Sequence, residues 1–276
     1  MRFTFIASLI ILISNLAFSQ SQIDSSKNNY HIFNPTPKNL MRDFETDRPD
    51  ITESAYSIDA GHFQFETDLF RTEKSKTNGV TTILNAYNLI NLKIGLNNSM
   101  DLQAVVSSFE TENVKLENLA QKSSGFGDIT LRLKKNLWGN DGGKTALAVM
   151  PYVTIPNANS TAKVSGGIIF PFALSLPNEW GFGAQIQTDV LENQNNTNYH
   201  FRFLTSATLS HALFNKCNFF IESYFTRDSE VDFSEYFANG GIIYDLTKNL
   251  KIDAGFNYGI KQESSKVYFI GLSFRY

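Results

Sequence analysis

The sequence predicts an all-β fold, namely a transmembrane, antiparallel, up-and-down β-barrel of about 12 strands. Three observations predict it. The chain begins with an export signal, the remainder divides into a regular series of alternating strands, and the connections between these strands alternate in length. The composition agrees, because 24 Phe and 11 Tyr are many for 276 residues, and aromatic side chains favour strands.

The first residues have the pattern of a secretory signal peptide. Met1-Arg2 gives a short positive start, residues 3–16 are mostly apolar, and Ala17 and Ser19 are small residues at the two positions that a signal peptidase reads. We assign residues 1–19 to this signal peptide. No later stretch is apolar over the roughly 18–20 residues that a transmembrane helix needs. An exported chain that enters a membrane must therefore do so with strands.

Two polar segments lie between the signal peptide and the first strand. Residues 20–42 are rich in Ser, Asn and Lys and cannot bury enough apolar surface to order themselves, so we expect a flexible periplasmic leader. Residues 43–60 are dense in charge, and they form either a solvated acidic stretch or a plug in the periplasmic mouth of the barrel. The spacing of the carboxylates does not match a calcium-binding loop, so we expect no metal. The plug candidates are Asp43, Glu45, Asp47, Arg48, Asp50 and Glu53.

Residues 61–276 alternate with a period of two, and we assign them to the barrel. Successive side chains of a strand point to opposite faces, and in most segments one face is apolar while the other is polar or charged. In the second segment, we expect Leu84, Ala86, Ile90 and Leu92 to share one face. The expected strands are 61–72, 81–96, 100–110, 126–137, 144–155, 166–176, 180–191, 199–212, 217–227, 236–246, 250–260 and 267–276.

The apolar faces are expected to meet lipid. A soluble β-sandwich would have shorter strands of about 5–6 residues, and a lipocalin-like barrel would have fewer strands with apolar residues inside. About 12 long strands carry more apolar surface than one closed ring can enclose, so the polar face should line the lumen. These polar residues either form a solute path or satisfy one another across a narrow interior. The lumen candidates are Glu66, Asp68, Asn91, Lys93, Arg132, Lys134, Gln185, Gln187, Asp189, Arg202 and Asp253.

The connections are expected to be short at one end of the barrel and longer at the other. The short ones hold Asn, Asp, Gly or Pro, as tight turns require, and they are 96–100, 138–144, 177–180, 213–216 and 247–249. The longer, polar ones are 72–80, 111–125, 156–165, 192–198, 228–235 and 261–266. Short periplasmic turns, longer outer loops and an even strand number would place both ends of the barrel in the periplasm.

The last ten residues alternate and end on an aromatic side chain. One face of this strand is apolar or aromatic, and it consists of Tyr268, Ile270, Leu272, Phe274 and Tyr276. The strand resembles the C-terminal strand of bacterial outer-membrane barrels, which the barrel-assembly machinery recognises. The resemblance implies that this machinery and outer-membrane lipid are partners of the chain. The alternative is the last strand of a soluble sheet.

Several motifs resemble one family of bacterial outer-membrane transporters, named for the MetA pathway of phenol degradation. They are the acidic Arg-Pro motif at residues 46–54, the following Gly61–Glu66, Gly125–Ile129 with Lys134, and Pro151–Pro156. The resemblance extends from Phe44 to Tyr276. It implies an outer-membrane barrel assigned to transport, with no agreed substrate, and the phenol label is only a family name.

We therefore expect a passive outer-membrane channel for small solutes, with aromatic and other small organic compounds as candidates. One alternative is an occluded structural barrel that presents its outer loops. Another is a barrel phospholipase, which would need a Ser–His pair. The histidines are His31, His62, His200 and His211, and His211 cannot pair with its strand neighbour Ser210 because the two point to opposite faces. We expect no enzymatic activity and no cofactor, and a net charge of −3 without a basic patch gives no reason to expect nucleic acid.

Overall fold

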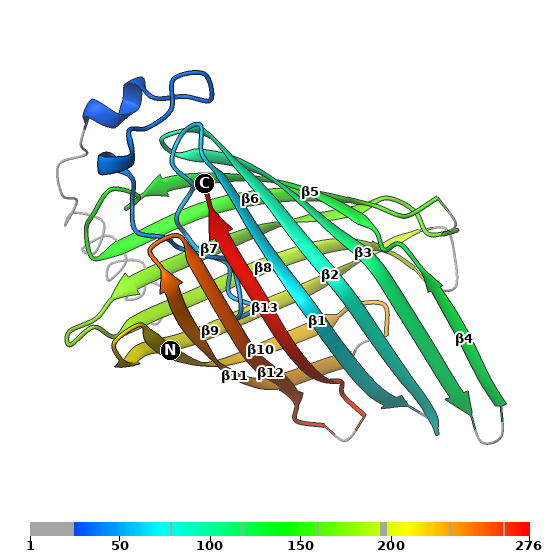
Figure 1. The fold of residues 1–276 in the computed structure, drawn as a ribbon. Coiled ribbons are helices and arrows are strands. Elements are labelled where there is room, and N and C mark those ends of the chain that lie inside the picture. The colour runs from blue at the N-terminus through cyan, green and yellow to red at the C-terminus, as the bar shows by residue number, and fades with distance from the viewer. Residues whose placement is uncertain are drawn as a thin grey trace, which may run out of the picture.

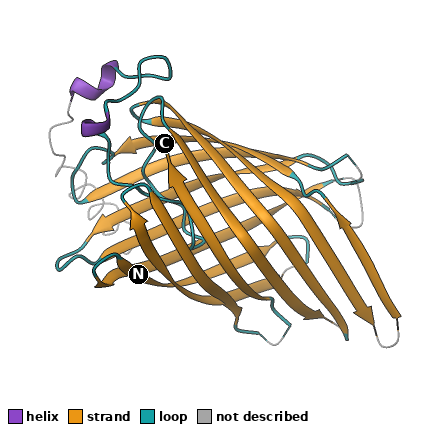
Figure 2. Ribbon diagram, in the orientation of Figure 1, coloured by secondary structure: helices purple, strands orange, loops and turns teal. Residues whose placement is uncertain are grey.

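A computed structural model describes residues 25–77, 79–116, 119–158, 160–193, 198–231, 233–261 and 263–276. The expected signal peptide lies outside the described residues. Figures 1 and 2 show strands wound into a tilted barrel, with two short helices outside one of its ends. The strands are β1 Phe63–Thr77, β2 Val80–Asn97, β3 Met100–Leu116, β4 Leu119–Gly125, β5 Ile129–Trp138, β6 Thr145–Ile155, β7 Ser165–Ser175, β8 Gly181–Glu192, β9 Tyr199–Phe214, β10 Cys217–Asp228, β11 Phe233–Thr247, β12 Leu250–Gly259 and β13 Lys266–Arg275.

The barrel is a closed antiparallel ring of twelve strands, as the sequence predicted. β4 and β5 count as one strand, because both pair with β3 in a single continuous register, from Glu110 opposite Gly125 to Val106 opposite Ile129. The other neighbours in the ring are consecutive in the chain, and β1 pairs with β13 to close it. A closed ring leaves no unpaired edge along its wall, which is what a sheet in hydrocarbon requires.

The two faces of the wall differ in polarity as predicted. Ile186, Ile242 and Ile270 on the outside are each at least half exposed, whereas Lys134 and Asp189 inside are at most 1% exposed. A soluble protein has the opposite arrangement, because charged side chains are almost never buried in it. An apolar exterior around a polar lumen is the pattern of transmembrane barrels.

The five predicted short turns lie together at one end, which we call the short-turn end. The barrel begins and finishes there, since the backbone amides of Phe63 and Tyr276 each donate a hydrogen bond to the other's carbonyl oxygen, at 3.2 and 2.9 Å. We call the opposite end the far end. The connections 156–164 and 260–265 at the far end are longer, as expected.

Two of the expected long loops are wrong. Residues 72–77 continue β1, and residues 111–116 and 119–125 form a hairpin between β3 and β4, so only two residues separate each pair of strands. The polar composition suggested loops, but rung-by-rung pairing extends the strands from Thr72 opposite Asn85 to Thr77 opposite Val80. These hairpins form the lower right corner of the barrel in Figure 1.

The side chains of β2 change faces in mid-strand, contrary to the single apolar face that we expected. Asn88 of β2 has a positive φ of 52°. In β1, the strand next to it, a bulge lies between Asp68 and Phe70. Beyond Asn88 toward the far end, Ala86 is buried inside the barrel, whereas Tyr87 is 39% exposed and its ring lies 5.4 Å from that of Phe70. One extra residue in a strand moves all the following side chains to the other face of the sheet. A prediction from the two-residue period alone cannot locate such a residue.

The described part of the expected leader, residues 25–42, is packed against the short-turn end and includes the 3₁₀ helices Ser25–Asn29 and Lys38–Leu40. Lys27 forms a 2.9 Å ion pair with Asp141, and the Thr36 carbonyl oxygen lies 2.7 Å from His62 Nε2. The prediction of a flexible segment is therefore corrected for these residues. Their composition cannot form a core of its own, but the end of the barrel supplies partners that composition does not reveal.

Candidate functional site

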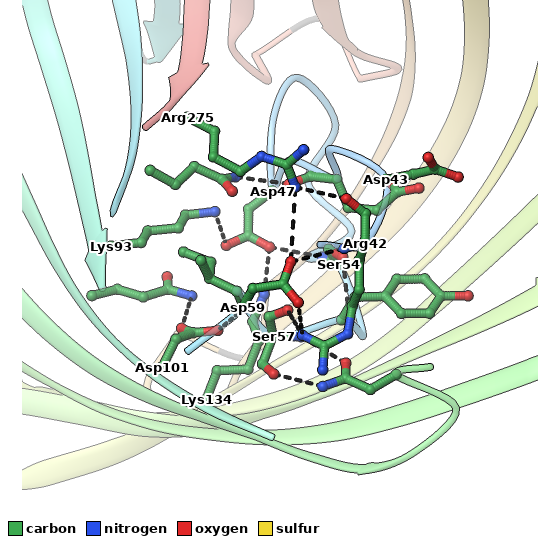
Figure 3. Close-up of a pocket in the computed structure, with 16 residues that line it drawn as sticks. Arg42, Asp43, Asp47, Ser54, Ser57, Asp59, Lys93, Asp101, Lys134 and Arg275 are labelled. Carbon is green, nitrogen blue, oxygen red and sulfur yellow. Dashed lines mark hydrogen bonds and ion pairs between the residues drawn. The ribbon is translucent and has the colours of Figure 1, made fainter. Parts of the chain in front are cut away.

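Residues 43–60, which we call the inner segment, fold into the barrel from the short-turn end. Figure 3 shows Asp47, Ser54, Ser57 and Asp59 surrounded by side chains of the wall. The segment has hydrogen bonds or ion pairs with β1, β2, β3, β5, β8, β9, β10 and β12. Different residues of the segment contact different strands of the wall.

Asp47 lies at the centre of a buried cluster of four charges. Its carboxylate oxygens are each 2.5 Å from an ammonium nitrogen, one from Lys93 of β2 and one from Lys134 of β5. Lys93 also pairs with Glu66 of β1, whose carboxylate accepts the backbone N–H of Asp47 at 3.1 Å. Burial alone would raise the pKa of Asp47, but the two ammonium groups outweigh it and lower this pKa well below its usual range. The cluster is neutral overall, with two carboxylates and two ammonium groups.

Arg48 extends from the segment toward β1 and β12, whereas Asp47 extends toward β2 and β5. Its guanidinium pairs with Asp68 of β1 and forms a fork with Asp253 of β12, at 2.6 and 3.2 Å. It lies directly over Gly271, where a Cβ atom would be only 1.9 Å from the Arg48 Nη2. Burial would lower the pKa of Arg48, but the two carboxylates raise it, so the guanidinium stays charged.

The tip of the segment is held by backbone contacts to Glu222 of β10. The N–H groups of Ile51 and Thr52 donate to this carboxylate at 2.9 and 2.8 Å, and Asn239 of β11 donates to it at 2.6 Å. The Thr52 hydroxyl also bonds Ser206 of β9 at 2.7 Å. Glu222 thus receives several donors, which stabilise a carboxylate in a buried place.

Glu53 contacts the wall through both side chain and backbone. Its carboxylate is 2.7 Å from Arg132 of β5, and its N–H donates to Gln185 of β8 at 2.7 Å. Burial raises the pKa of Glu53 to about 7, although Arg132 acts against this rise.

The base of the segment closes the short-turn end. Arg42, just before the segment, donates from Nε to Asp141 at 2.9 Å, and its backbone N–H donates to Asp59 at the same distance. Asn136 of β5 donates to the carbonyl oxygen of Ala55 at 2.8 Å, and Ile58 donates to Asp101 of β3 at 3.1 Å.

All the predicted lumen residues lie on the inner face. Glu66, Asp68, Lys93, Arg132, Lys134, Gln185 and Asp253 contact the inner segment. The others bond one another or neighbouring strands, with Asp189 2.9 Å from Arg202 and accepting from Gln187 at 2.7 Å, and Asn91 donating to Gln103 at 3.3 Å.

The plug candidates are divided between two environments. Asp47, Arg48, Asp50 and Glu53 lie among wall side chains, whereas Asp43 and Glu45 are exposed near the mouth at the short-turn end. Four partners of this region were not predicted from the sequence. They are Asn98 and Asp141, which accept hydrogen bonds from Arg42, together with Asp101 and Glu222. The alternation of β10 could have shown Glu222 on the polar face, but no sequence signal pairs it with residues 51–52.

Three cavities surround the inner segment. One of about 190 Å³ lies toward the short-turn end, beside Arg42, Asp43 and Asp59. A second of about 340 Å³ lies toward the far end, beside Arg71, Leu89 and Tyr152. A third of about 250 Å³ lies between the segment and β7–β12. The interior is narrow but not filled.

The described residues contain neither of two other kinds of feature. In that part of the chain, no group of three or more His, Cys, Asp or Glu side chains is placed to hold a metal ion. Among the same residues, no helix is both long and apolar enough to cross a membrane.

The closed ring, with its apolar exterior and polar interior, defines the class of the protein as a transmembrane β-barrel, and the fold matches outer-membrane barrels of known structure. An outer-membrane channel from Pseudomonas putida F1 superposes with a TM-score of 0.53 at 12% identity, over 84% of this chain and all of that one. The NanC porin gives 0.52 at 10% identity over 76% of this chain and 98% of the porin. The β domain of the Bordetella autotransporter BrkA superposes with a TM-score of 0.52 at 11% identity, over 78% of this chain and 99% of that domain. At these identities the likeness concerns the fold.

Residues 46–276 match the family described as "Putative MetA-pathway of phenol degradation", and the chain belongs to that family. The match begins at the acidic Arg-Pro motif that suggested it. No curated protein matches the sequence.

Proposed function

We propose that the protein is a passive outer-membrane channel for small solutes, narrowed by its inner segment. The observation that carries this proposal is a polar lumen with cavities on more than one side of a docked charged segment. Charges that line a pore control which solutes pass it. Twelve strands give a lumen between those of packed eight-stranded barrels and open sixteen-stranded porins, so small molecules fit and proteins do not.

The polarity of the wall and the sequence patterns of residues 1–19 and of β13 support an outer-membrane location. The residues of the outer face would meet lipid, and the pattern of residues 1–19 would direct export. The short-turn end would then face the periplasm. The outward face of β13, which carries Tyr268, Ile270, Leu272, Phe274 and Tyr276, would be read by the barrel-assembly machinery.

The contacts of the histidines support a channel rather than a phospholipase. His62 and His211 face backbone carbonyl oxygens, at 2.7 and 3.0 Å from Nε2, and His200 lies between Asn193 and Asp228, at 3.0 and 3.1 Å. The His31 Nδ1 accepts a backbone N–H at 3.3 Å. Within the described part of the chain, none of these contacts gives a histidine the serine partner that nucleophilic catalysis needs.

An occluded structural barrel is the second candidate, because the inner segment is fastened to many strands at once. Conductance distinguishes the two. We expect purified full-length protein in planar lipid bilayers to give small, discrete current steps, and liposomes that contain it to swell in glycerol or amino acids. A barrel that inserts into the bilayer but gives neither current nor swelling would contradict the channel and favour the structural role.

A further inference from the structure

The inner segment forms its ion pairs with the wall on one side of the lumen, whereas it forms hydrogen bonds with β8, β9 and β10 on the other side. Its ion pairs go to Lys93, Lys134 and Arg132 of β2 and β5, and to Asp68 and Asp253 of β1 and β12. These strands form a continuous arc of the ring from β12 through β13, β1, β2 and β3 to β5. We call this arc the anchoring wall.

The opposite arc, β7–β9, presents small uncharged side chains to the segment near the short-turn end. Ala173, Gly183 and Thr208 form one rung across these three strands, and Ser175, Gly181 and Ser210 form the next. Gly183 points inward, because a Cβ atom there would lie 3.2 Å from the methyl carbon of Thr52 and 2.7 Å from that of Thr208. We call these two rungs the small-residue wall.

The third cavity lies between the small-residue wall and the segment. It is lined by Ala173, Gly183 and Thr208 on the wall side, with Thr52 and Ala55 on the segment side. Glu45, Ser54 and Tyr56 line both this cavity and the one toward the short-turn end. Arg48, Asp50 and Glu53 line both it and the one toward the far end. Neighbouring cavities therefore share residues of the segment. The hydrogen bonds of Thr52 to Ser206 and of Glu53 to Gln185 lie between the second cavity and the third.

We propose that solutes cross the barrel through an eccentric passage along the small-residue wall. The hydrogen bonds of Thr52 and Glu53 to Ser206 and Gln185 open for this passage, while the ion pairs keep the inner segment docked on the anchoring wall. Gly183 and Ala173 then determine specificity, because their lack of side-chain bulk sets the width of the passage. This inference rests on the proposed channel function.

The lining also indicates a class of solute. The wall side offers hydroxyls, small side chains and the ring of Phe220, and carries no charge on its two rungs. The segment side offers hydrogen-bonding groups and charges of both signs, including Arg48 and Glu53. A small uncharged solute with one apolar face and one polar edge matches the two sides best, since a net charge of either sign would meet a like charge on the segment.

Cysteine labelling after folding tests the passage without disturbing assembly. In a Cys217→Ser background, Ala173→Cys is modified with a bulky methanethiosulfonate reagent, and current and glycerol swelling are measured before and after. The control is Ser107→Cys, a near-isosteric change on the inner face of β3, in the anchoring wall and away from the linings of the three cavities. We expect modification of Ala173→Cys to reduce both signals by roughly half or more, and Ser107→Cys to keep them.

The outcomes separate this inference from the channel itself. One outcome is that the Ala173→Cys protein conducts and mass spectrometry shows that it is labelled, yet its current does not fall. This outcome would contradict the passage but not the channel function. The passage would also be overturned if the protein conducts but the reagent cannot reach the thiol at position 173. It would likewise be overturned if labelling at position 107 reduces the current as much as labelling at position 173. If the unmodified proteins insert but neither conduct nor admit glycerol, the channel and the passage fail together. As a second variant, Gly183→Ala should slow the swelling of larger solutes more than that of glycerol.

Discussion

At the scale of single residues, the docking of the inner segment depends on a missing side chain. The Arg48 guanidinium occupies the space over Gly271 that a Cβ atom would take, and so reaches both Asp68 and Asp253. Gly271 faces inward between Phe269 and Ser273, which are also buried. Glycine in a strand often marks such a close approach.

Gly271→Ala should therefore displace Arg48 and loosen the segment. A Cβ atom 1.9 Å from Nη2 cannot be accommodated without movement, and overpacking of this kind costs about 1–3 kcal/mol. We expect a lower midpoint of urea unfolding in detergent and noisier single-channel current. Gly240→Ala is the matched control, because its nearest neighbour would be 3.4 Å away. Equal stability of the two variants would show that the position of Arg48 does not depend on Gly271.

At the scale of elements, the inner segment is held by charges that balance only when it is docked. Lys93 and Lys134 both pair with the carboxylate of Asp47, and each lysine side chain is at least 97% buried. Removal of one partner of a buried ion cluster leaves the others unpaired, which costs far more than the pair contributes.

Asp47→Ala should weaken docking by about 3–5 kcal/mol and raise the mean conductance, because the unpaired lysines favour water in place of the segment. The control is Glu179→Ala, which removes a carboxylate from an exposed position in the turn between β7 and β8, outside the linings of the three cavities, and should leave the conductance as it is. Single-channel recordings of both variants provide the measurement. If Asp47→Ala conducts like the unsubstituted protein while remaining folded, the segment does not limit the current.

The elements also show how far the sequence could be interpreted. Alternation identified the inner face of the strands that carry Lys93, Lys134 and Asp189, because a period of two is local. It missed the continuation of β1 through residues 72–77, since a polar hairpin at the far end has the composition of a loop. It also missed the change of face at Asn88, which depends on a left-handed backbone conformation. The partners of the inner segment could not be predicted, because Ile51 and Glu222 meet only through closure of the ring.

At the scale of the whole molecule, the protein places its charges inside and its apolar side chains outside. Along β8, Ile186 is 64% exposed on the outer face, whereas its neighbour Gln185 is 2% exposed and bonds the inner segment. The same alternation recurs around the ring. The proposed channel requires that the outer face of the barrel meets the hydrocarbon of a membrane.

Spin labels along β8 test that dependence most directly. Single cysteines at residues 183–188 in a Cys217→Ser background are labelled, reconstituted in lipid, and assayed for collision with oxygen and with a polar nickel complex. We predict a strict two-residue period, in which positions 184, 186 and 188 collide with oxygen and are shielded from the nickel complex. If those three positions instead collide freely with the nickel complex in a correctly folded barrel, their side chains face water and the outer face is not the membrane-spanning surface.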